Sequence, residues 1–478
     1  MAKSLSDLLA GHAEPVEIDA KEVRDANLQA SAPILVVLDD DPTGTQSVAD
    51  LPVLTAWDTE DLEWGFQTGK PAIYVMTNSR SLSADDAAKI NREVVESAYR
   101  AAKKFDGLNI SFVSRSDSTL RGHFPLEPNV LADAIKEETG ADVDGIVVIP
   151  AFADAGRITV NGIHYAGSEA DGFTPVGETE FAKDATFGFK SSDLSEWIEE
   201  KTEGAVKADQ VISIDLTELR TDLEAVVEKL RSATNRQPII CDSVTEDDLR
   251  ILALALNKAE EAGSKFLYRV GPPFVRARIG QDPKAPLNTD EIDKSRQGRE
   301  TVKGGLIVIG SHVDLTTRQL NNLRENLKLA EYEIDVQKIL DDETRDSHIS
   351  EIVENAVSGL ADDHVVIRTS RKLVRGHDGA SSLEISRRVS AAVVDVVRGI
   401  VGQVTPRFVI AKGGITSSDV ASKGLGIRRA TVIGPMLPGI VSLWSGENEP
   451  ARGIPYIVFA GNVGDETSLT AVAKKLSN

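Results

Sequence analysis

The chain has very little cysteine, no long apolar run and no surplus of positive charge. Cys241 is the only cysteine among 478 residues, so no internal disulfide can form, which is typical of a reducing compartment. No stretch of about 18 apolar residues offers a membrane-spanning helix, and residues 1–25 lack the apolar core of a secretory signal. The formal net charge of −22 disfavours nucleic acid and anionic membranes as partners, because both require a basic surface. We therefore expect a cytoplasmic protein that binds small molecules.

The composition that remains is that of an ordinary globular protein. Hydrophobic residues make up 41% of the sequence, and the length favours two domains. Short β-branched runs alternate with helix-length stretches such as 84–105 and 223–233, a pattern that indicates βαβ units and mainly parallel sheets. The expected strands are 34–38, 72–76, 110–113, 146–149, 211–214 and 239–241, then 306–309, 365–369, 407–410, 430–433 and 456–459.

The alternation is interrupted once, at residues 281–303. This stretch combines two prolines with many charged residues, which is typical of an interdomain linker. We therefore predict an N-terminal extension over 1–30, a first α/β domain over 31–280, a linker over 281–303 and a second α/β domain over 304–478. Each domain is expected to be a mainly parallel sheet flanked by helices.

Three consecutive carboxylates follow the first predicted strand. Asp39, Asp40 and Asp41 precede a Pro-Thr-Gly turn that ends at Gly44. In open α/β sheets, ligands bind at the carboxyl ends of the strands. Crowded carboxylates repel one another unless a metal, a hydroxylated ligand or a basic residue joins them. The simpler interpretation is a solvated turn in which an Asp caps the next helix, but a cap requires one Asp rather than three.

Three more polar motifs follow strands in the first half, at 77–80, 114–123 and 150–157. Arginine binds a carboxylate through two hydrogen bonds, and aspartate accepts hydrogen bonds from hydroxyls, so the set suits a small polyhydroxy acid. Helix caps and surface arginines are the alternative explanation. Arg157 is a further candidate, whereas His123 is equally compatible with packing. The candidate substrate-binding residues are Asp40, Asp41, Thr43, Gly44, Arg80, Arg115, Ser116, Asp117, Ser118 and Arg121.

In the second half, glycines follow the strands, at 310–312, 411–419, 434–439 and 461–465. Glycine lets backbone N–H groups approach phosphate oxygens, and a helix N-terminus adds favourable partial charge. Neither a Walker A motif nor a dinucleotide fingerprint occurs, and ordinary tight turns are the alternative. Lys412 offers a point charge. The candidate nucleotide-binding residues are Ser311, Lys412, Gly413, Gly414, Ile415, Thr416, Gly434, Gly461 and Asn462.

These motifs resemble the four-carbon acid sugar kinase family over residues 34–470. The family pattern Asp-Asp-x-Thr-Gly matches residues 40–44, and Lys-x-Asp-Ser-Thr-x-Arg-Gly matches 115–122 with Arg115 replacing the Lys. The resemblance implies a sugar-acid-binding N-terminal domain and a C-terminal domain that binds ATP through Ser311, residues 413–416 and Gly461. It also implies an active site in the interdomain cleft. Many members carry Lys-Ser or Lys-Pro where this chain has 459–460, and a small residue and Leu at positions 39 and 42.

We therefore expect an ATP-dependent kinase that phosphorylates a hydroxyl of a small sugar acid, similar to threonate, erythronate or a related aldonate. Mg²⁺ would bridge the phosphates with few protein ligands, none of which the sequence identifies. The candidate bases are Asp41, Asp117 and Asp40. Two alternatives remain open: a haloacid-dehalogenase-like phosphatase with Asp39 as nucleophile and Asp41 as acid/base, and a non-catalytic sugar-acid-binding protein. The region 159–203 shapes the pocket, makes an oligomer contact or forms a solvated loop. A homodimer is the expected assembly, as the commonest for soluble enzymes.

Overall fold

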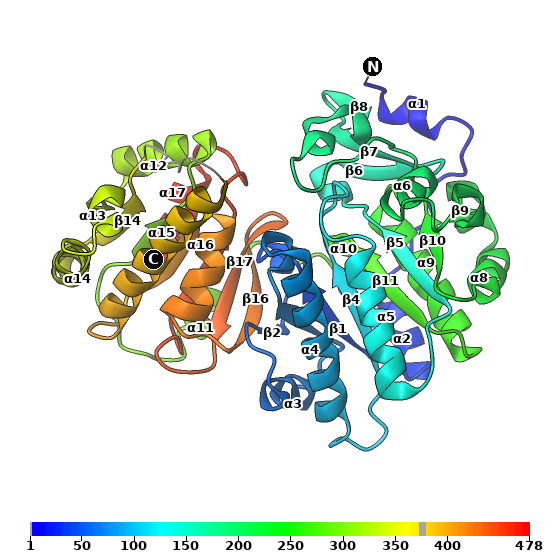
Figure 1. Ribbon diagram of the computed structural model, residues 1–478, viewed down its shortest axis with the longest axis horizontal. Helices are drawn as coiled ribbons and strands as arrows, with labels where there is room; N and C mark the ends of the chain where they lie inside the picture. The colour runs from blue at the N-terminus through cyan, green and yellow to red at the C-terminus, as the bar shows by residue number, and fades with distance from the viewer. Residues whose placement is uncertain (1, 372–378) are drawn as a thin grey trace. The chain divides into compact units, whose positions relative to one another are not determined.

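A computed structural model of the chain describes residues 2–371 and 379–478 (Figure 1). It contains two compact units. The first comprises the chain up to Val48 together with Trp57–Pro283, and the second comprises Ala49–Ala56 together with Lys284–Asn478. No helix in the described residues combines the length and apolar character needed to cross a membrane.

The first unit is built on a parallel sheet with the strand order β3-β1-β4-β11-β5-β10-β9. Most of its strands are buried on both faces, which explains their continuous apolar sequences. All six strands expected in this half are present, whereas β11 was not predicted. The strands are β3 (Ala72–Met76), β1 (Ile34–Asp39), β4 (Ile110–Arg115), β11 (Phe266–Val270), β5 (Gly145–Ile149), β10 (Gln237–Cys241) and β9 (Ile212–Ile214).

Helices cover this sheet. Figure 1 shows α4 (Ala84–Ala102) and α5 (Leu126–Thr139) side by side in front of β1 and β4. α2 (Ala20–Gln29) packs against α9 (Glu246–Glu261) and α10 (Pro272–Arg278), so the predicted N-terminal extension is an integral part of this unit. The remaining helices are α1 (Leu5–Leu9), α3 (Thr59–Gln67), α6 (Leu194–Lys201), α7 (Leu216–Thr221) and α8 (Leu223–Ser232).

A separate antiparallel sheet forms where the sequence left several interpretations open. It consists of β6 (Arg157–Val160), β7 (Ile163–Ser168) and β8 (Gly172–Pro175). Side chains of this sheet share a small core with α1, which includes Ile158, Tyr165, Phe173 and Leu8. The region is therefore folded around its own hydrophobic cluster and is not simply a solvated loop.

The second unit contains five parallel strands followed by three antiparallel ones. The parallel strands are β13 (Leu329–Ile334), β14 (His364–Thr369), β12 (Leu306–Ile309), β15 (Val409–Lys412) and β18 (Pro455–Phe459). The antiparallel strands are β17 (Ile440–Gly446), β16 (Arg429–Leu437) and β2 (Leu51–Leu54). The predicted mainly parallel sheet thus carries an antiparallel edge, one strand of which comes from the N-terminal half of the sequence.

The helices of this unit begin within the predicted linker. α11 (Thr289–Ser295) is capped by the Asn288 side chain and buries Ile292 in the core of the unit, so this part of 281–303 is packed rather than extended. The others are α12 (Asp314–Asn326), α13 (Val336–Leu340), α14 (Arg345–Asp362), α15 (Gly379–Val401), α16 (Gly414–Asp419) and α17 (Ser468–Ser477).

Candidate functional site

The register of three strands brings the acidic motif together with two arginine motifs. β1 lies between β3 and β4, and Asp39 at its end is paired with Met76 on one side and Arg115 on the other. The loops after all three strands therefore begin at one edge of the sheet. The backbone fastens them together, because Thr77 donates from its N–H to the carbonyl of Asp39 at 3.0 Å and Arg80 donates to that of Asp40 at 3.3 Å.

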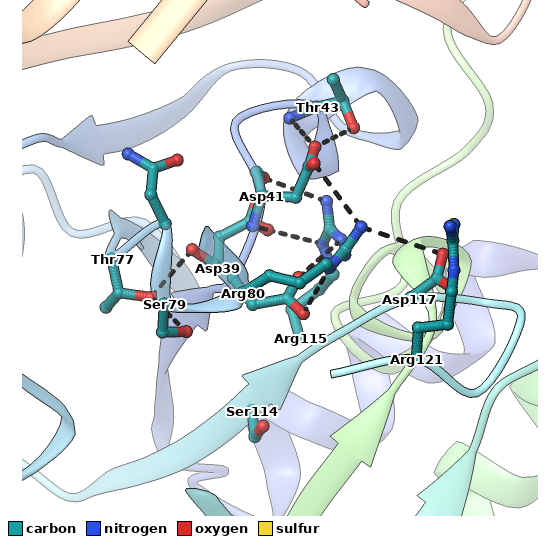
Figure 2. A network of polar contacts seen from close by, with 12 residues as sticks. Asp39, Asp41, Thr43, Thr77, Ser79, Arg80, Ser114, Arg115, Asp117 and Arg121 are labelled. Carbon is teal, nitrogen blue, oxygen red and sulfur yellow. Dashed lines mark hydrogen bonds and ion pairs between the residues drawn. The ribbon is translucent and has the colours of Figure 1, made fainter. Parts of the chain in front are cut away.

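Arg80 is at the centre of the resulting polar network (Figure 2). Its Nε and Nη2 donate to the two carboxylate oxygens of Asp40, at 3.0 and 2.6 Å. Its Nη1 lies 3.5 Å from Oδ2 of Asp41 and 3.9 Å from Oδ1 of Asp117. Asp117 also accepts from Nε of Arg121 at 2.8 Å. The sequence motifs at 39–44, 77–80 and 114–123 therefore share one polar network at this edge of the sheet.

The guanidinium of Arg115 is bound by the loop that carries Asp39, Asp40 and Asp41, which we call the acidic loop. Its Nε lies 2.7 Å from Oδ1 of Asp39 as an ion pair, although neither Nε nor Oδ2 of Asp39 has a hydrogen-bond partner in the described residues. Its Nη1 lies 3.4 Å from Oδ1 of Asp40, and its Nη2 donates to the Asp41 carbonyl at 3.3 Å. This guanidinium, which is 3% exposed, holds the loop in place.

Gly44 is required sterically rather than for its backbone angles. A Cβ at this position would lie 2.0 Å from Oδ2 of Asp39 and 2.1 Å from Nε of Arg115. The backbone at Gly44 therefore covers the Asp39–Arg115 pair, and Asp39 is fully buried. A buried and covered carboxylate cannot reach a phosphate ester, so the geometry gives no support to Asp39 as a phosphatase nucleophile.

Burial and neighbouring charge shift the pKa values of the acidic groups in opposite directions. Burial raises the pKa of Asp39 to about 8, against the opposing charge of Arg115. Burial would also raise the pKa of Asp117, but Arg80 and Arg121 outweigh it and hold that pKa below its ordinary value. The same balance, with Arg80 and Arg115 as the opposing charges, lowers the pKa of Asp41. Within one network, the pKa of one carboxyl is therefore raised and those of two others are lowered.

A second buried carboxyl supports the Arg80 turn from below. Glu127, on α5, accepts hydrogen bonds from the hydroxyl of Ser79 and from Nδ2 of Asn91, the latter at 3.3 Å. Burial, reinforced by the charge of Asp40, raises the pKa of Glu127 to about 7. Glu127 falls outside the motifs described above, and its position on a helix gave no sequence signal.

Of the remaining predicted residues of this site, Thr43 and Ser118 have structural partners. Thr43 donates from its backbone N–H to Asp41 at 2.9 Å, and the Ser118 carbonyl lies 2.8 Å from Nε2 of His164. The Ser116 hydroxyl is buried and has no hydrogen-bond partner among the described residues. His123 lies 3.1 Å from the Ser79 carbonyl, consistent with a packing role.

Three strands of the second unit bring the predicted glycine loops together. β12, β15 and β18 are parallel neighbours, and Lys412 at the end of β15 is paired with Ile309 and Phe459. A Cβ on Gly310 would lie 2.0 Å from the Thr416 hydroxyl, and one on Gly461 would lie 2.5 Å from the Ser311 hydroxyl. We call Gly310, Ser311, Gly413, Thr416 and Gly461 the glycine cradle.

The cradle combines a backbone conformation that favours glycine with hydroxyl groups. Gly413 has a φ of +127°, which L side chains rarely adopt, and a Cβ there would be 3.3 Å from the Ser311 Cβ. The Thr316 hydroxyl donates to the Gly461 carbonyl at 2.9 Å and so fixes the last turn. An arrangement of glycine backbone and hydroxyls at the carboxyl ends of parallel strands suits phosphate groups.

Lys412 and Gly434 do not occupy the positions expected of them. Lys412 is fully buried, donates to the Ala460 carbonyl at 2.6 Å and lies 3.9 Å from the Phe459 ring centroid. Burial lowers its pKa to about 7, so it supports the last turn from below and is not an exposed point charge. The predicted strand end at 433 is wrong, because β16 continues to Leu437 with a register shift between Val432 and Gly434, and Gly434 lies beside the Lys284 side chain.

A cavity of about 240 Å³ adjoins the glycine cradle. Gly310, His312 and Thr416 line one side of it, and the exposed side chain of Ile415 also contributes. Its apolar walls come from helices that the sequence did not connect with the site, through Val336, Ile385, Val389 and Val393. Thr369, Ser386, Ser390 and Asp419 add polar atoms. Gly414 lies in α16 beside this cavity, and Asn462 is exposed on the last turn.

No described residues form a ready metal site. Groups of three or more His, Cys, Asp or Glu side chains able to hold a metal ion are absent from residues 2–371 and 379–478. The acidic residues of the Arg80 network are already paired with arginines. They therefore do not fit a metal held by the protein alone.

Comparison with known families and structures agrees with this division of the chain. The model of a sugar-binding N-terminal domain matches residues 35–278, and that of a nucleotide-binding C-terminal domain matches residues 306–469. A search of curated proteins gave no match. A Salmonella typhimurium LT2 structure, whose name suggests a tRNA synthase, has a TM-score of 0.65 and 18% identity, covering 91% of this chain and 98% of its own. The Haemophilus influenzae protein HI1011, of the DUF1537 family, has a TM-score of 0.62 and 19% identity, covering 92% and 99%. At these identities the likeness concerns the fold.

Proposed function

The chain belongs to the two-domain four-carbon acid sugar kinase family, and from this premise we propose that it transfers the γ-phosphoryl group of ATP to a hydroxyl of a small sugar acid. The observation that carries the proposal is the pairing of two complementary sites in one chain. The first unit offers carboxylates and guanidinium groups at one sheet edge, and the second offers a glycine cradle beside a mostly apolar cavity. Polyhydroxy acids and nucleotides require these respective chemistries.

The hydrogen bonds distinguish the three candidate bases. Both oxygens of Asp40 are held by Arg80 and the side chain is 2% exposed, so we assign it to the support of the loop. Asp117 is 12% exposed, and its Oδ1 lies 3.9 Å from Nη1 of Arg80. We propose Asp117 as the group that accepts the proton of the substrate hydroxyl, with Asp41 as its alternative.

The nucleotide is expected to use the second unit alone. The phosphates would lie along the glycine cradle, and the base would enter the adjoining cavity between Ile415 and Val389. Mg²⁺ would arrive with the nucleotide and neutralise phosphate charge, bound mainly by phosphate oxygens and water. The position of the transfer between the two domains stays a prediction from the family resemblance, and a dimeric assembly stays a prediction from its frequency among soluble enzymes.

The experiment that tests the function is ADP release from ATP and Mg²⁺ with a panel of four- to six-carbon sugar acids. Turnover with one acid, lost when Mg²⁺ is chelated, supports the kinase. Phosphate release from a sugar-acid phosphate, without ADP release for any acid, contradicts it. Binding of acid and ATP without turnover favours the non-catalytic alternative.

A further inference from the structure

One buried arginine of the first unit differs from the other buried arginines there. Arg269, on β11, is 1% exposed and forms no direct ion pair among the described residues, although the nearby charges of Asp40, Glu127 and Asp117 oppose the lowering of its pKa by burial. Its Nη1 has no hydrogen-bond partner, and its Nη2 donates only to the Arg121 carbonyl, at 3.2 Å. The comparably buried arginines of this unit each lie 2.6–2.8 Å from a carboxylate oxygen, and they are Arg115, Arg220, Arg276 and Arg278.

Aromatic rings compensate the Arg269 charge only in part. The guanidinium lies 5.3 Å from the ring centroid of Trp197 and 5.6 Å from that of Phe124. Such contacts stabilise a cation but give Nη1 no acceptor. A buried N–H group without an acceptor is costly, so Nη1 of Arg269 points to an anion that binds nearby.

Arg157 also has a guanidinium N–H group without a hydrogen-bond acceptor, and it lies in a more accessible position. It begins β6, its Nη1 donates to the Ala155 carbonyl, and its Nε has no partner among the described residues. Its guanidinium lies 5.6 Å from the ring centroid of Phe181, and that of Arg121 lies 5.3 Å from the same ring. Arg157 and Phe181 also line an open cavity of about 550 Å³.

Arg121 connects the two unpaired arginines. Its carbonyl accepts from Arg269, and its guanidinium shares the Phe181 ring with Arg157. Arg80 and Arg115 are neutralised by the acidic loop, and Arg121 by Asp117. Arg157 and Arg269 therefore keep N–H groups without an acceptor among the described residues, in a chain whose formal net charge is −22.

We propose that the small β6–β8 sheet completes the acid site, with Arg157 and Arg121 binding the substrate carboxylate beside the Phe181 ring. Arg269 is a positioning residue in this arrangement, because its guanidinium is buried and acts on the carboxylate through the protein interior, where charge interactions are strong. This inference rests on the proposed function and assigns the end of the substrate away from the reacting hydroxyl. It also gives the 159–203 region a role in selecting acids over neutral sugars.

The test measures acid binding without nucleotide. We would titrate the full-length protein with threonate and erythronate, and with threitol, which keeps the hydroxyls but lacks the carboxylate. The expected result is that Arg157→Gln and Arg269→Met each weaken acid binding at least tenfold, while threitol and ATP bind as before. Arg236→Gln, which removes a guanidinium paired with Asp133 and Asp142, should leave acid binding unchanged.

Two further comparisons keep the outcomes separate. Arg269→Lys restores the charge, so it should recover most of the acid affinity if Arg269 acts electrostatically rather than by packing. Unchanged acid affinity in both Arg157→Gln and Arg269→Met overturns the inference, even where the wild type turns over ATP. Acid selectivity that is lost in these variants, in a wild type that never releases ADP, supports the subsite and overturns the kinase.

Discussion

The two units of this protein form their candidate binding sites by different physical means. The first unit places charged side chains so densely that most of them bind one another, with Arg80 contacting three carboxylates and Arg115 two. The second unit uses small residues and backbone; Lys412 is buried beneath the cradle, and Arg371 donates to the Ser311 carbonyl. Ligand binding by a charge network depends on each of its charges and therefore on pH. Ligand binding by a glycine cradle depends on the space that the missing side chains leave. Substitutions that remove charge and substitutions that add volume should therefore affect different steps.

The largest expected effect is that of Asp117→Asn. This change removes the proposed proton acceptor but keeps the shape of the side chain, so kcat should fall about 10²–10⁴-fold. ATP affinity, measured by calorimetry, should not change. Asp142→Asn is the matched control, since Asp142 belongs to a surface ion pair with Arg236 in the same unit. Full turnover in Asp117→Asn would transfer the role to Asp41.

Next in size is Gly310→Ala in the second unit. The added methyl group would lie 2.0 Å from the Thr416 hydroxyl, so the cradle must shift. We expect turnover to fall about a hundredfold, because displacements of this kind misplace the phosphates. The loss should appear in ATP binding, and threonate binding by the first unit serves as the internal control. Weakened acid binding with normal ATP binding would contradict the assignment of ATP to the second unit and of the acid to the first.

Gly44→Ala makes the corresponding change in the first unit, where volume is not expected to be the main determinant. The methyl group would collide with the Asp39–Arg115 pair, and overpacking of a core typically costs about 1–3 kcal/mol. Chemical denaturation should therefore show a less stable protein, together with weaker acid binding. A variant of wild-type stability would show that the loop after β1 can move away from the pair.

The smallest effect is on the pH dependence of stability. The pKa of Asp39 is raised to about 8 and that of Glu127 to about 7, so the folded state holds protons that the unfolded chain has released. Their contribution is complete below the unfolded pKa values and is lost as the pH rises through the folded ones. The free energy of unfolding should decrease between pH 5 and 8 as the folded state releases these protons. Asp39→Asn combined with Glu127→Gln should flatten this slope, and Asp133→Asn should not.

The sequence predicted the strands of the site well because their apolar runs are unambiguous. β1, β3, β4 and β5 were all located to within two residues, and the polar loops at their carboxyl ends followed from the parallel arrangement. β11 was missed because Arg269 interrupts its apolar run, and β13 because its glutamates alternate with apolar residues at the edge of the sheet.

Which arginine binds which carboxylate could not be predicted from spacing. Asp39 and Arg115 are 76 positions apart and meet only because β1 and β4 pair in one register. Glu127 and Arg269 lie outside the motifs and reach the network through a helix face and an unpredicted strand. Sequence patterns located the loops, whereas the tertiary register determined their internal pairing.

Strand β2 has a consequence for how this architecture can be rearranged. Because residues 49–56 belong to the second unit, the chain crosses between the units three times, near positions 48, 56 and 283. No single cut separates them, and a fragment that starts at Lys284 would expose the edge of β16, which β2 otherwise covers. Recombination at one boundary would therefore yield aggregation-prone halves, and the two units are expected to be inherited together rather than exchanged as independent modules.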